Sequence, residues 1–431
     1  MRLGDVCLKI GSGATPRGGK EVYLPGGAAT LIRSQNVYND RFERAGLVYL
    51  LPEHADQLKN VEVRPEDILL NITGDSVARV CQVPDDVLPA RVNQHVAIIR
   101  PDPEKLHPRF LRFFLASPRM QAHMFGLAAA GATRNALTKS MIEGFTLPEL
   151  SLRDQLAIAT LLGALEDKID LNRRTNDTLE ATTCALFKDW FEDFGPTYAK
   201  VEGRTPSLAP DLWSHFPDAL DDSGKPLGWS VSEIRNLTSA IQYGFTQSAK
   251  PTGPGPQFLR ITDIQGGRVV WQSVPFCDAS KEEEQKYQLV TGDIVVARTG
   301  ASTGENLYVV EPPPSVFASY LVRFQFTDAA IARLVAQFMR SKDYRSFVAR
   351  SIGGSAQPNA SAQLLGSAPM LVPTQRVANA FFAFVSPMDK VRRNNERENE
   401  SLTQLRDLLL PRLMSGEVHL KDAERKTGEA L

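Results

Sequence analysis

The sequence lacks the features of membrane, secreted and disulfide-stabilised proteins. None of its 431 residues falls in an apolar run of about 18, the length that a membrane helix needs. The opening stretch, MRLGDVCLKIGSG, has no apolar core of the kind found in secretory signals. The four cysteines lie far apart without a C-x-x-C pair, which argues against a disulfide framework or a zinc knuckle: Cys7, Cys81, Cys184 and Cys277. We expect a cytoplasmic protein whose cysteines are buried thiols.

Neither sign of charge is in excess. The formal net charge is −1, with 49 Lys and Arg against 50 Asp and Glu. This balance argues against a small, uniformly basic nucleic-acid binder but leaves local basic surfaces possible. A hydrophobic content of 42% and a charged content of 23% are those of an ordinary globular protein. The length predicts two or three domains, each with its own core.

Nucleotide, metal and nucleophile motifs are also missing. The stretch GSGATPRGGKE (11–21) has neither the spacing of a phosphate-binding loop nor a hydroxyl residue after Lys20, and Pro16 occupies the third glycine position of a dinucleotide turn. The six histidines form no H-E-x-x-H motif, and no G-x-S-x-G elbow or N-P-P-F or D-P-P-Y methyltransferase motif is present. These absences predict a chain without catalytic residues, metal ligands or a cofactor of its own.

The chain contains two related copies of one pattern. Residues 66–76, EDILLNITGDS, match residues 292–302, GDIVVARTGAS, and each stretch predicts a strand that leads into a glycine turn. Upstream, residues 30–37, TLIRSQNV, resemble residues 257–264, QFLRITDI. The copies are about 225 residues apart, far above the period of a solenoid repeat, so we infer a duplicated domain.

Each copy continues into helices. Residues 109–120, RFLRFFLASPRM, and 333–344, RLVAQFMRSKDY, predict short amphipathic helices, and each is followed by a loop of small residues. A proline and a long helical pattern then close each copy. We therefore predict an α+β fold with two tandem β-rich mixed units separated by two long helices.

The long helices carry a heptad pattern with asparagines inside it. In the first helix, spacings of three and four place these residues on one stripe: Leu162, Leu165, Ile169, Asn172, Asn176, Leu179, Thr183, Leu186 and Trp190. The corresponding stripe of the second helix is Val385, Met388, Arg392, Asn395, Asn399, Leu402, Arg406, Leu409 and Leu413. An asparagine pair therefore recurs at the same phase of both helices.

The length of these helices predicts that they pair with each other. A helix of roughly 40 residues spans about 60 Å and needs a long partner to bury its stripe. The simplest arrangement is an antiparallel coiled coil with pseudo-twofold symmetry, in which facing asparagines hydrogen-bond and penalise slipped registers. Alternatively, the asparagines are solvent-facing positions on a curved helix. Arg392 and Arg406 interrupt the second stripe and suggest contacts with further partners.

The loops of both copies carry side chains that suit hydrogen bonding to the edges of DNA bases. In the first copy the candidates are Thr15, Arg17, Arg33, Gln35, Asn36, Asp75, Arg79, Arg134 and Asn135. In the second copy they are Thr246, Gln247, Arg260, Thr262, Arg298, Thr299, Gln357 and Asn359. Arg, Asn and Gln can make the paired hydrogen bonds that distinguish guanine from adenine, although any one of these residues could also be a solvated loop residue.

The helical segments resemble those of a known family. Residues 147–194, LPELSLRDQLAIATLLGALEDKIDLNRRTNDTLEATTCALFKDWFEDF, and residues 401–418, SLTQLRDLLLPRLMSGEV, are similar to the two helical conserved regions of the specificity subunits of type I restriction-modification systems. The similarity spans essentially the whole chain. Members of that family carry two target recognition domains, each followed by a helix, and the helices pair antiparallel as a spacer.

The resemblance implies a domain order. The predicted segments are target recognition domain 1 at 1–146, the central conserved helical region at 147–194, a connector at 195–229, target recognition domain 2 at 230–372, the distal conserved helical region at 373–418 and a polar tail at 419–431. The connector is rich in Pro, Gly and Asp and is expected to wrap on a surface.

The resemblance also implies a function that the spacings alone do not show. Each globular domain would read one half of a bipartite double-stranded DNA sequence, and the helix pair would set the gap and dock two modification subunits. Restriction subunits would join them. S-adenosylmethionine, ATP and Mg would then be held by partner subunits, and this chain would be no enzyme. The alternative is a duplicated scaffold that binds proteins without reading DNA.

Overall fold

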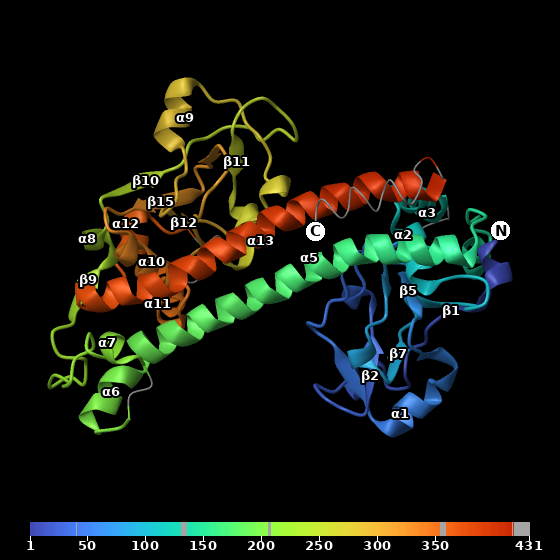
Figure 1. Cartoon of the computed structure of the whole chain (residues 1–431), viewed down its shortest axis with the longest axis horizontal. Coiled ribbons are helices and arrows are strands. Elements are labelled where there is room, and N and C mark those ends of the chain that lie inside the picture. Colours follow the sequence, from blue (N-terminus) through green and yellow to red (C-terminus); the bar gives the residue numbers. More distant parts are fainter. Residues whose placement is uncertain (40, 131–135, 206–207, 354–358, 416, 418–431) are drawn as a thin grey trace. The chain divides into compact units, whose positions relative to one another are not determined.

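The computed structural model describes residues 1–39, 41–130, 136–205, 208–353, 359–415 and 417. The chain forms two compact units. The first unit contains Met1–Ile169 and Ser401–Leu431, and the second contains Asp170–Glu400. The long helices α5 (Leu152–Phe187) and α13 (Gln375–Ser415) each contribute one part to either unit. Figure 1 labels many of the helices and strands along the chain.

The first unit is built on two four-stranded sheets. The main sheet has the order β1-β8-β5-β6 and is antiparallel throughout, with strands β1 (Cys7–Ser12), β5 (Ile68–Asn71), β6 (Val80–Gln82) and β8 (Val96–Pro101). The second sheet has the order β3-β2-β7-β4, with β2 (Ala29–Ile32), β3 (Val48–Leu50), β4 (Glu62–Val63) and β7 (Ala90–Val92). Its central strands β2 and β7 are parallel. The apolar runs ILLN and VAII form central strands because both of their faces are buried.

Short helices follow the strands of the first unit. They are α1 (Pro52–Gln57), α2 (Pro108–Ala116), α3 (Pro118–Ala129) and α4 (Lys139–Glu143). A side chain caps the N-terminus of α3, where Ser117 accepts a hydrogen bond from the backbone N–H of Met120. The apolar face of α2 contributes Phe110, Leu111 and Phe113 to a core that also contains the main sheet and the α5 residues before 170.

The second unit repeats this arrangement. Its main sheet has the order β10-β15-β12-β13, with β10 (Ala240–Tyr243), β12 (Ile294–Ala297), β13 (Asn306–Tyr308) and β15 (Leu321–Gln325). A parallel pair, β11 (Gln257–Leu259) with β14 (Ser315–Phe317), corresponds to β2 and β7. An antiparallel pair joins β9 (Ser230–Glu233) to β16 (Pro369–Val372). The helices are α8 (Ile234–Leu237), α9 (Lys281–Tyr287), α10 (Ala329–Phe338), α11 (Lys342–Ile352) and α12 (Ala362–Gly366).

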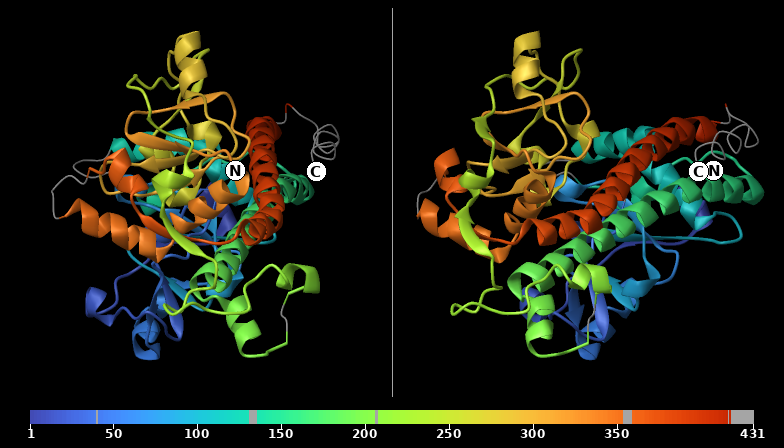
Figure 2. Two further views of the ribbon diagram at one scale, coloured as in Figure 1. Left: turned by 90° about the vertical axis from the view of Figure 1, so that its left-hand side faces the viewer. Right: turned by 60° about the vertical axis from the view of Figure 1, so that its left-hand side comes forward.

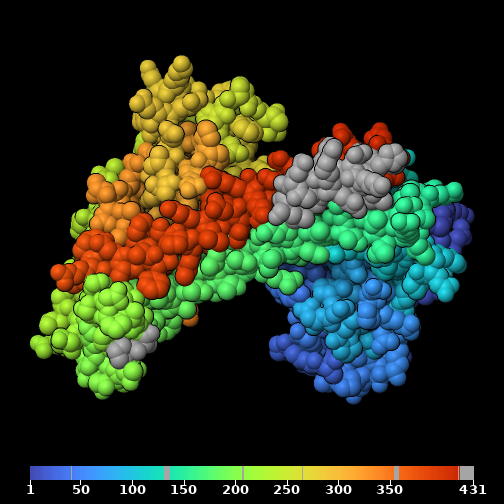
Figure 3. All heavy atoms as spheres, in the orientation of Figure 1, coloured from blue at the N-terminus to red at the C-terminus, as the bar shows by residue number. Residues whose placement is uncertain are grey.

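The second unit's part of the helix pair is antiparallel. Asn172 on α5 contacts Asn399 on α13, and Thr183, further along α5, contacts Met388, which comes earlier on α13. Residues of α10 and of the first part of α13 share one hydrophobic core. Figure 2 shows the ribbon from two further directions. In the space-filling view the side chains of α5 and α13 close against each other within this unit (Figure 3). The predicted α+β fold with two β-rich units and antiparallel long helices is confirmed.

The predicted connector is more ordered than a linker on a surface. It contains α6 (Gly195–Val201) and α7 (Pro210–Trp213), and it follows a π-helical turn over Lys188–Glu192 that ends α5. Phe216 and Trp229 of the connector are buried in the core of the second unit, where the rings of Phe216 and Trp190 meet edge to face at 4.9 Å. These two aromatic residues therefore anchor the connector in the core of the second unit.

Candidate nucleic-acid interface

Four polar side chains meet at one end of the main sheet of the first unit. Because β8 runs antiparallel to both β1 and β5, the end of β1, the end of β5 and the start of β8 lie at the same end of the sheet. Thr15 Oγ1 donates to Gln94 Oε1 at 2.5 Å, and Gln94 Nε2 lies 3.0 Å from His95 Nε2. His95 Nδ1 in turn lies 2.6 Å from Thr73 Oγ1. We call these four residues the first loop cluster.

Backbone contacts hold the loops of this cluster together. Gly13 N–H donates to Val96 O at 2.9 Å, and Ala14 N–H donates to Val92 O at 3.1 Å, so the chain after β1 lies directly against the loop before β8. A Cβ atom at Gly13 would lie 2.1 Å from the carbonyl oxygen of Val92 and 2.3 Å from that of Asn93. Only glycine allows so close an approach of two backbones.

This close approach leads to a stability prediction. We expect Gly13→Ala to lower the free energy of unfolding by about 2 to 3 kcal/mol, because the added methyl group must push two backbone segments apart. Gly11→Ala is the matched control, since a Cβ at Gly11 meets nothing within 4 Å. Urea denaturation of the purified chain measures both variants, and equal loss of stability in the two would contradict the packing argument.

The second unit holds its corresponding loops with matching hydrogen bonds. Gly244 N–H donates to Leu321 O at 3.2 Å, as Gly13 N–H does to Val96 O. Arg298 N–H donates to Tyr320 O at 3.0 Å, as Ile72 N–H does to His95 O. The duplicated domains therefore share one backbone frame at this end of the sheet, and Tyr320 occupies the place of His95.

The side chains on the second frame differ from those on the first. The Arg298 guanidinium lies 4.9 Å from the centre of the Tyr243 ring and donates from Nη2 to Asn359 Oδ1 at 3.1 Å. Thr299 forms an antiparallel bridge with Asn359. The side chain of Tyr320 is directed to solvent, with 58% of the residue exposed. We call these five residues the second loop cluster.

Both clusters present groups that suit nucleic-acid bases. Thr, Gln and His offer the first cluster donors and acceptors for base edges, while the second cluster offers a guanidinium, an amide and an exposed aromatic ring. The frame is common to the two units and the exposed chemistry is different.

The remaining candidates of the first copy have other surroundings. Arg33 Nη2 donates to Gly46 O at 2.5 Å, and Gln35 Nε2 lies 3.4 Å from the same oxygen. Asn36 is fully buried, and its amide accepts from Arg33 N–H and donates to Glu43 O, so it serves the loop and presents no atom to a base. Arg79 stacks 4.5 Å from the centre of the Tyr38 ring.

The remaining candidates of the second copy lie mostly in exposed loops. Arg260 makes two hydrogen bonds to Asp263, at 3.0 and 2.9 Å, and this contact raises the pKa of Arg260. Thr262 Oγ1 lies 3.4 Å from the same carboxylate. Gln247 Nε2 donates to Asp278 O at 3.1 Å. Thr246 follows the Gly244 turn, as Thr15 follows the Gly13 turn.

Five of the candidate DNA-binding residues remain, of which two are exposed and three lie outside the described part of the chain. Arg17 and Asp75 are exposed loop residues of the first unit. Arg134, Asn135 and Gln357 lie outside the described residues. The loop clusters thus include only four of the residues that the sequence singled out, namely Thr15, Arg298, Thr299 and Asn359.

Sequence reasoning missed the residues at the centre of each cluster. Gln94 and His95 lie in NQHV (93–96), and Tyr320 lies in ASYL (318–321). These two stretches are separated by nearly the same interval as the other repeated segments, so aligning the copies through β8 and β15 would have found them. Their side chains differ completely, which hides the correspondence from a search for similar residues.

The four asparagines of the heptad stripes lie between α5 and α13 in the second unit. They are Asn172, Asn176, Asn395 and Asn399. Asn172 and Asn176 are buried. Asn172 Nδ2 donates to Asn399 Oδ1 at 3.0 Å and to Glu398 Oε2 at 2.6 Å, and Asn395 Nδ2 donates to Asn176 Oδ1 at 2.8 Å. The amides therefore bond across the helix pair. Their role in fixing the register stays a prediction.

The four cysteines differ in their burial. Cys81 and Cys277 are buried, and burial raises the pKa of Cys81 to about 12. The expectation of buried thiols is wrong for Cys184, which is exposed, and for Cys7, which is half-buried.

Within the described ranges, no group of three or more His, Cys, Asp or Glu side chains is placed to hold a metal ion. Among the described helices, none is long and apolar enough to cross a membrane.

The architecture defines a class of protein: two related β-rich units whose chain continues through two long paired helices. A solved structure with the same fold is the S subunit of a type I restriction-modification system from M. genitalium, with a TM-score of 0.57 and 15% sequence identity. That match covers 96% of this chain and 95% of the other.

Curated relatives agree with that class. The chain is 23% identical over 436 residues to the specificity subunit of the type I restriction enzyme HindI of Haemophilus influenzae, covering 90% of this chain and 94% of that protein. It is 22% identical over 402 residues to the EcoKI specificity subunit of Escherichia coli, covering 89% of this chain and 81% of that protein. No family model matches the chain. The resemblance to type I specificity subunits is confirmed by these relatives, which align along most of its length.

Proposed function

We propose that this chain is the DNA-specificity subunit of a type I restriction-modification complex. The observation that carries the proposal is the repeated frame at the end of each main sheet, on which the two units display different polar and aromatic side chains. The relatives described above are specificity subunits, which is the role proposed for this chain.

In this proposal each globular domain reads one half of a bipartite sequence. The domain at 1–146 carries the first loop cluster, and the domain at 230–372 carries the second. Lysine and arginine contacts to phosphates would add affinity without sequence preference. The helical regions at 147–194 and 373–418 would set the gap between the half-sites, with the connector at 195–229 joining the copies.

Catalysis would belong to partner subunits. Two modification subunits would dock on the helical regions and bind S-adenosylmethionine, and restriction subunits would use ATP and Mg. A complex of this kind acts on cellular DNA, so we place it in the cytoplasm. The assignment predicts that the purified chain alone neither methylates nor cleaves DNA.

Methylation mapping tests the proposal. We expect cells that express this chain together with its modification subunit to methylate one bipartite motif with a fixed gap, detected by single-molecule sequencing. A chain carrying Arg298→Ala and Tyr320→Ala in the same complex is the control for dependence on this subunit. An intact, purified complex that methylates no sequence-specific motif would reject DNA readout and favour the protein-binding scaffold.

A further inference from the structure

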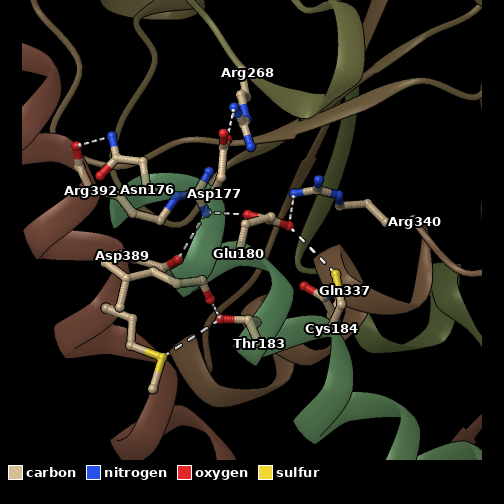
Figure 4. A network of polar contacts seen from close by, with 12 residues as sticks. Asn176, Asp177, Glu180, Thr183, Cys184, Arg268, Gln337, Arg340, Asp389 and Arg392 are labelled. Carbon is tan, nitrogen blue, oxygen red and sulfur yellow. Dashed lines mark hydrogen bonds and ion pairs between the residues drawn. The ribbon is translucent and has the colours of Figure 1, made fainter. Parts of the chain in front are cut away.

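A buried glutamate on α5 joins three elements of the second unit. Glu180 forms an ion pair with Arg392 on α13 and another with Arg340, which follows α10, where Arg340 Nη1 lies 2.7 Å from Glu180 Oε1. Figure 4 shows the Glu180 carboxylate between these two guanidinium groups. The Glu180 side chain is only 9% exposed. One carboxylate thus connects the helix pair to the globular domain.

A second glutamate on α5 makes the same connection in the first unit. Glu166 Oε1 accepts from both terminal nitrogens of Arg112 on α2, at 2.6 and 2.7 Å, and lies 3.5 Å from Arg406 Nη1 on α13. Its side chain is 15% exposed. Each unit therefore contains one α5 glutamate that is paired with one arginine of α13 and one arginine of its globular domain.

These contacts explain the two arginines that interrupt the apolar stripe of α13. Each of these arginines has a partner on α5 of the same chain, and the two arginines are two heptads apart, as the two glutamates are. Contact with further partners stays a prediction. The contacts are not merely exposed ion pairs, because the side chains of Arg392 and Arg406 are 12% and 19% exposed.

We infer that Glu166 and Glu180 are positioning residues that hold the α5–α13 register and tie each recognition domain to it, so that the gap between the two half-sites is fixed. The inference rests on the proposed function. A shift of α13 by one heptad in one direction would place Asn399 opposite Glu180 and Leu413 opposite Glu166. A shift in the other direction would place Val385 opposite Glu180 and Asn399 opposite Glu166. Either shift leaves a buried carboxylate without its α13 arginine, a strongly unfavourable arrangement.

A slipped register costs more free energy at the charged pairs than at the asparagine pairs. An asparagine that loses its partner leaves a neutral amide unsatisfied, whereas a slip of α13 takes Arg392 away from the Glu180 carboxylate, so that a charged pair is lost in a poorly hydrated place. Burial lowers the pKa of Arg340, and the Glu180 charge opposes this effect. The Glu180 carboxylate thus offsets part of the cost of burying the Arg340 guanidinium, and it also pairs with Arg392 of α13.

The experiment removes the charge and measures two independent quantities. In the complex with the modification subunit, binding is measured to duplexes whose gap is the cognate length or one base pair longer or shorter. We expect Glu180→Gln to reduce the preference for the cognate gap by about tenfold, since the wrong register is no longer penalised. The charge-matched control is Asp170→Asn, because the Asp170 side chain is half-exposed and lies 3.7 Å from Arg173 of the same helix.

The second quantity is the register itself, measured without DNA. Nitroxides attached through p-acetylphenylalanine replace the exposed residues Arg174 and Lys390, and pulsed electron resonance gives the distance between the two helices. We expect one narrow distance in the wild type and in Asp170→Asn, and a broader or second distance in Glu180→Gln. A slip of one heptad moves one label by about 10 Å along the helix.

A double variant guards against simple loss of folding. Glu180→Gln with Arg392→Gln leaves a neutral pair that can still hydrogen-bond across the helices, and circular dichroism verifies that it folds. A folded double variant with one narrow distance and full gap preference would overturn the inference. If the wild-type complex reads no bipartite sequence, the proposed function fails instead, and the distance measurement alone still decides whether Glu180 holds the register.

Discussion

Replacing Arg298 and Tyr320 with alanine is expected to weaken binding to the cognate bipartite duplex by about a hundredfold. Each side chain of the second loop cluster can contribute roughly 1 to 3 kcal/mol through hydrogen bonding or stacking with a base. A combined loss of about 3 kcal/mol corresponds to this factor. Binding to a duplex that lacks the second half-site should change little, because the first loop cluster is untouched.

Fluorescence anisotropy with the assembled complex measures this effect at a fixed salt concentration. The control is Arg345→Ala, which removes an equal charge from an exposed position on α11. If the control weakens binding as much as the double variant, the contribution of Arg298 and Tyr320 is general attraction to phosphates and not readout of the second half-site.

Lengthening both long helices is expected to lengthen the gap between the half-sites. Four residues inserted after Arg173 in α5 and four after Arg397 in α13 leave Asn172 opposite Asn399 and Asn176 opposite Asn395. Four residues add about 6 Å of helix. At about 3.4 Å per base pair, the methylated motif should gain one or two base pairs in its gap while both half-sites stay the same.

Methylation mapping of cells expressing the lengthened chain reads the new gap directly. Four residues inserted after Gly203, in the exposed loop that follows α6, provide the control, and this variant should keep the original gap. An insertion in α5 alone puts the residues on one side of the insertion out of register with α13. This variant should therefore no longer methylate a motif with one fixed gap. An unchanged gap in the doubly lengthened chain would reject the spacer role.

The repeated features of the fold could be predicted from the sequence because they have a strong period or a strong pattern. The buried strand around Leu69 and its copy around Val295 are apolar runs before glycine turns, and this pattern survives duplication. The heptad stripe likewise locates both long helices. The aromatic core of the connector could not be predicted, since Pro and Gly are typical of loops and nothing local shows that Phe216 and Trp229 pack on Trp190.

The candidate site was predicted less well than the fold. Residue type alone selected Asn36, whose amide is used by its own loop, and overlooked His95 and Tyr320. Base-reading chemistry and loop-stabilising chemistry use the same donors and acceptors, so composition cannot separate them. The two kinds of residue can be distinguished only when it is known which strand ends meet at one end of the sheet. That information comes from the three-dimensional pairing of the strands.

The hydrogen bonds that frame each loop cluster join backbone groups, as from Gly244 N–H to Leu321 O. A frame of this kind does not depend on the identity of the side chains it displays. Mutations at Thr15, Gln94, Arg298 or Tyr320 can therefore change the exposed side chains at small cost in stability, whereas a side chain at Gly13 or Gly244 would press on the backbone of the neighbouring loop. The side chains of one loop cluster can therefore change independently of those of the other, while the backbone frames and the long helices stay the same.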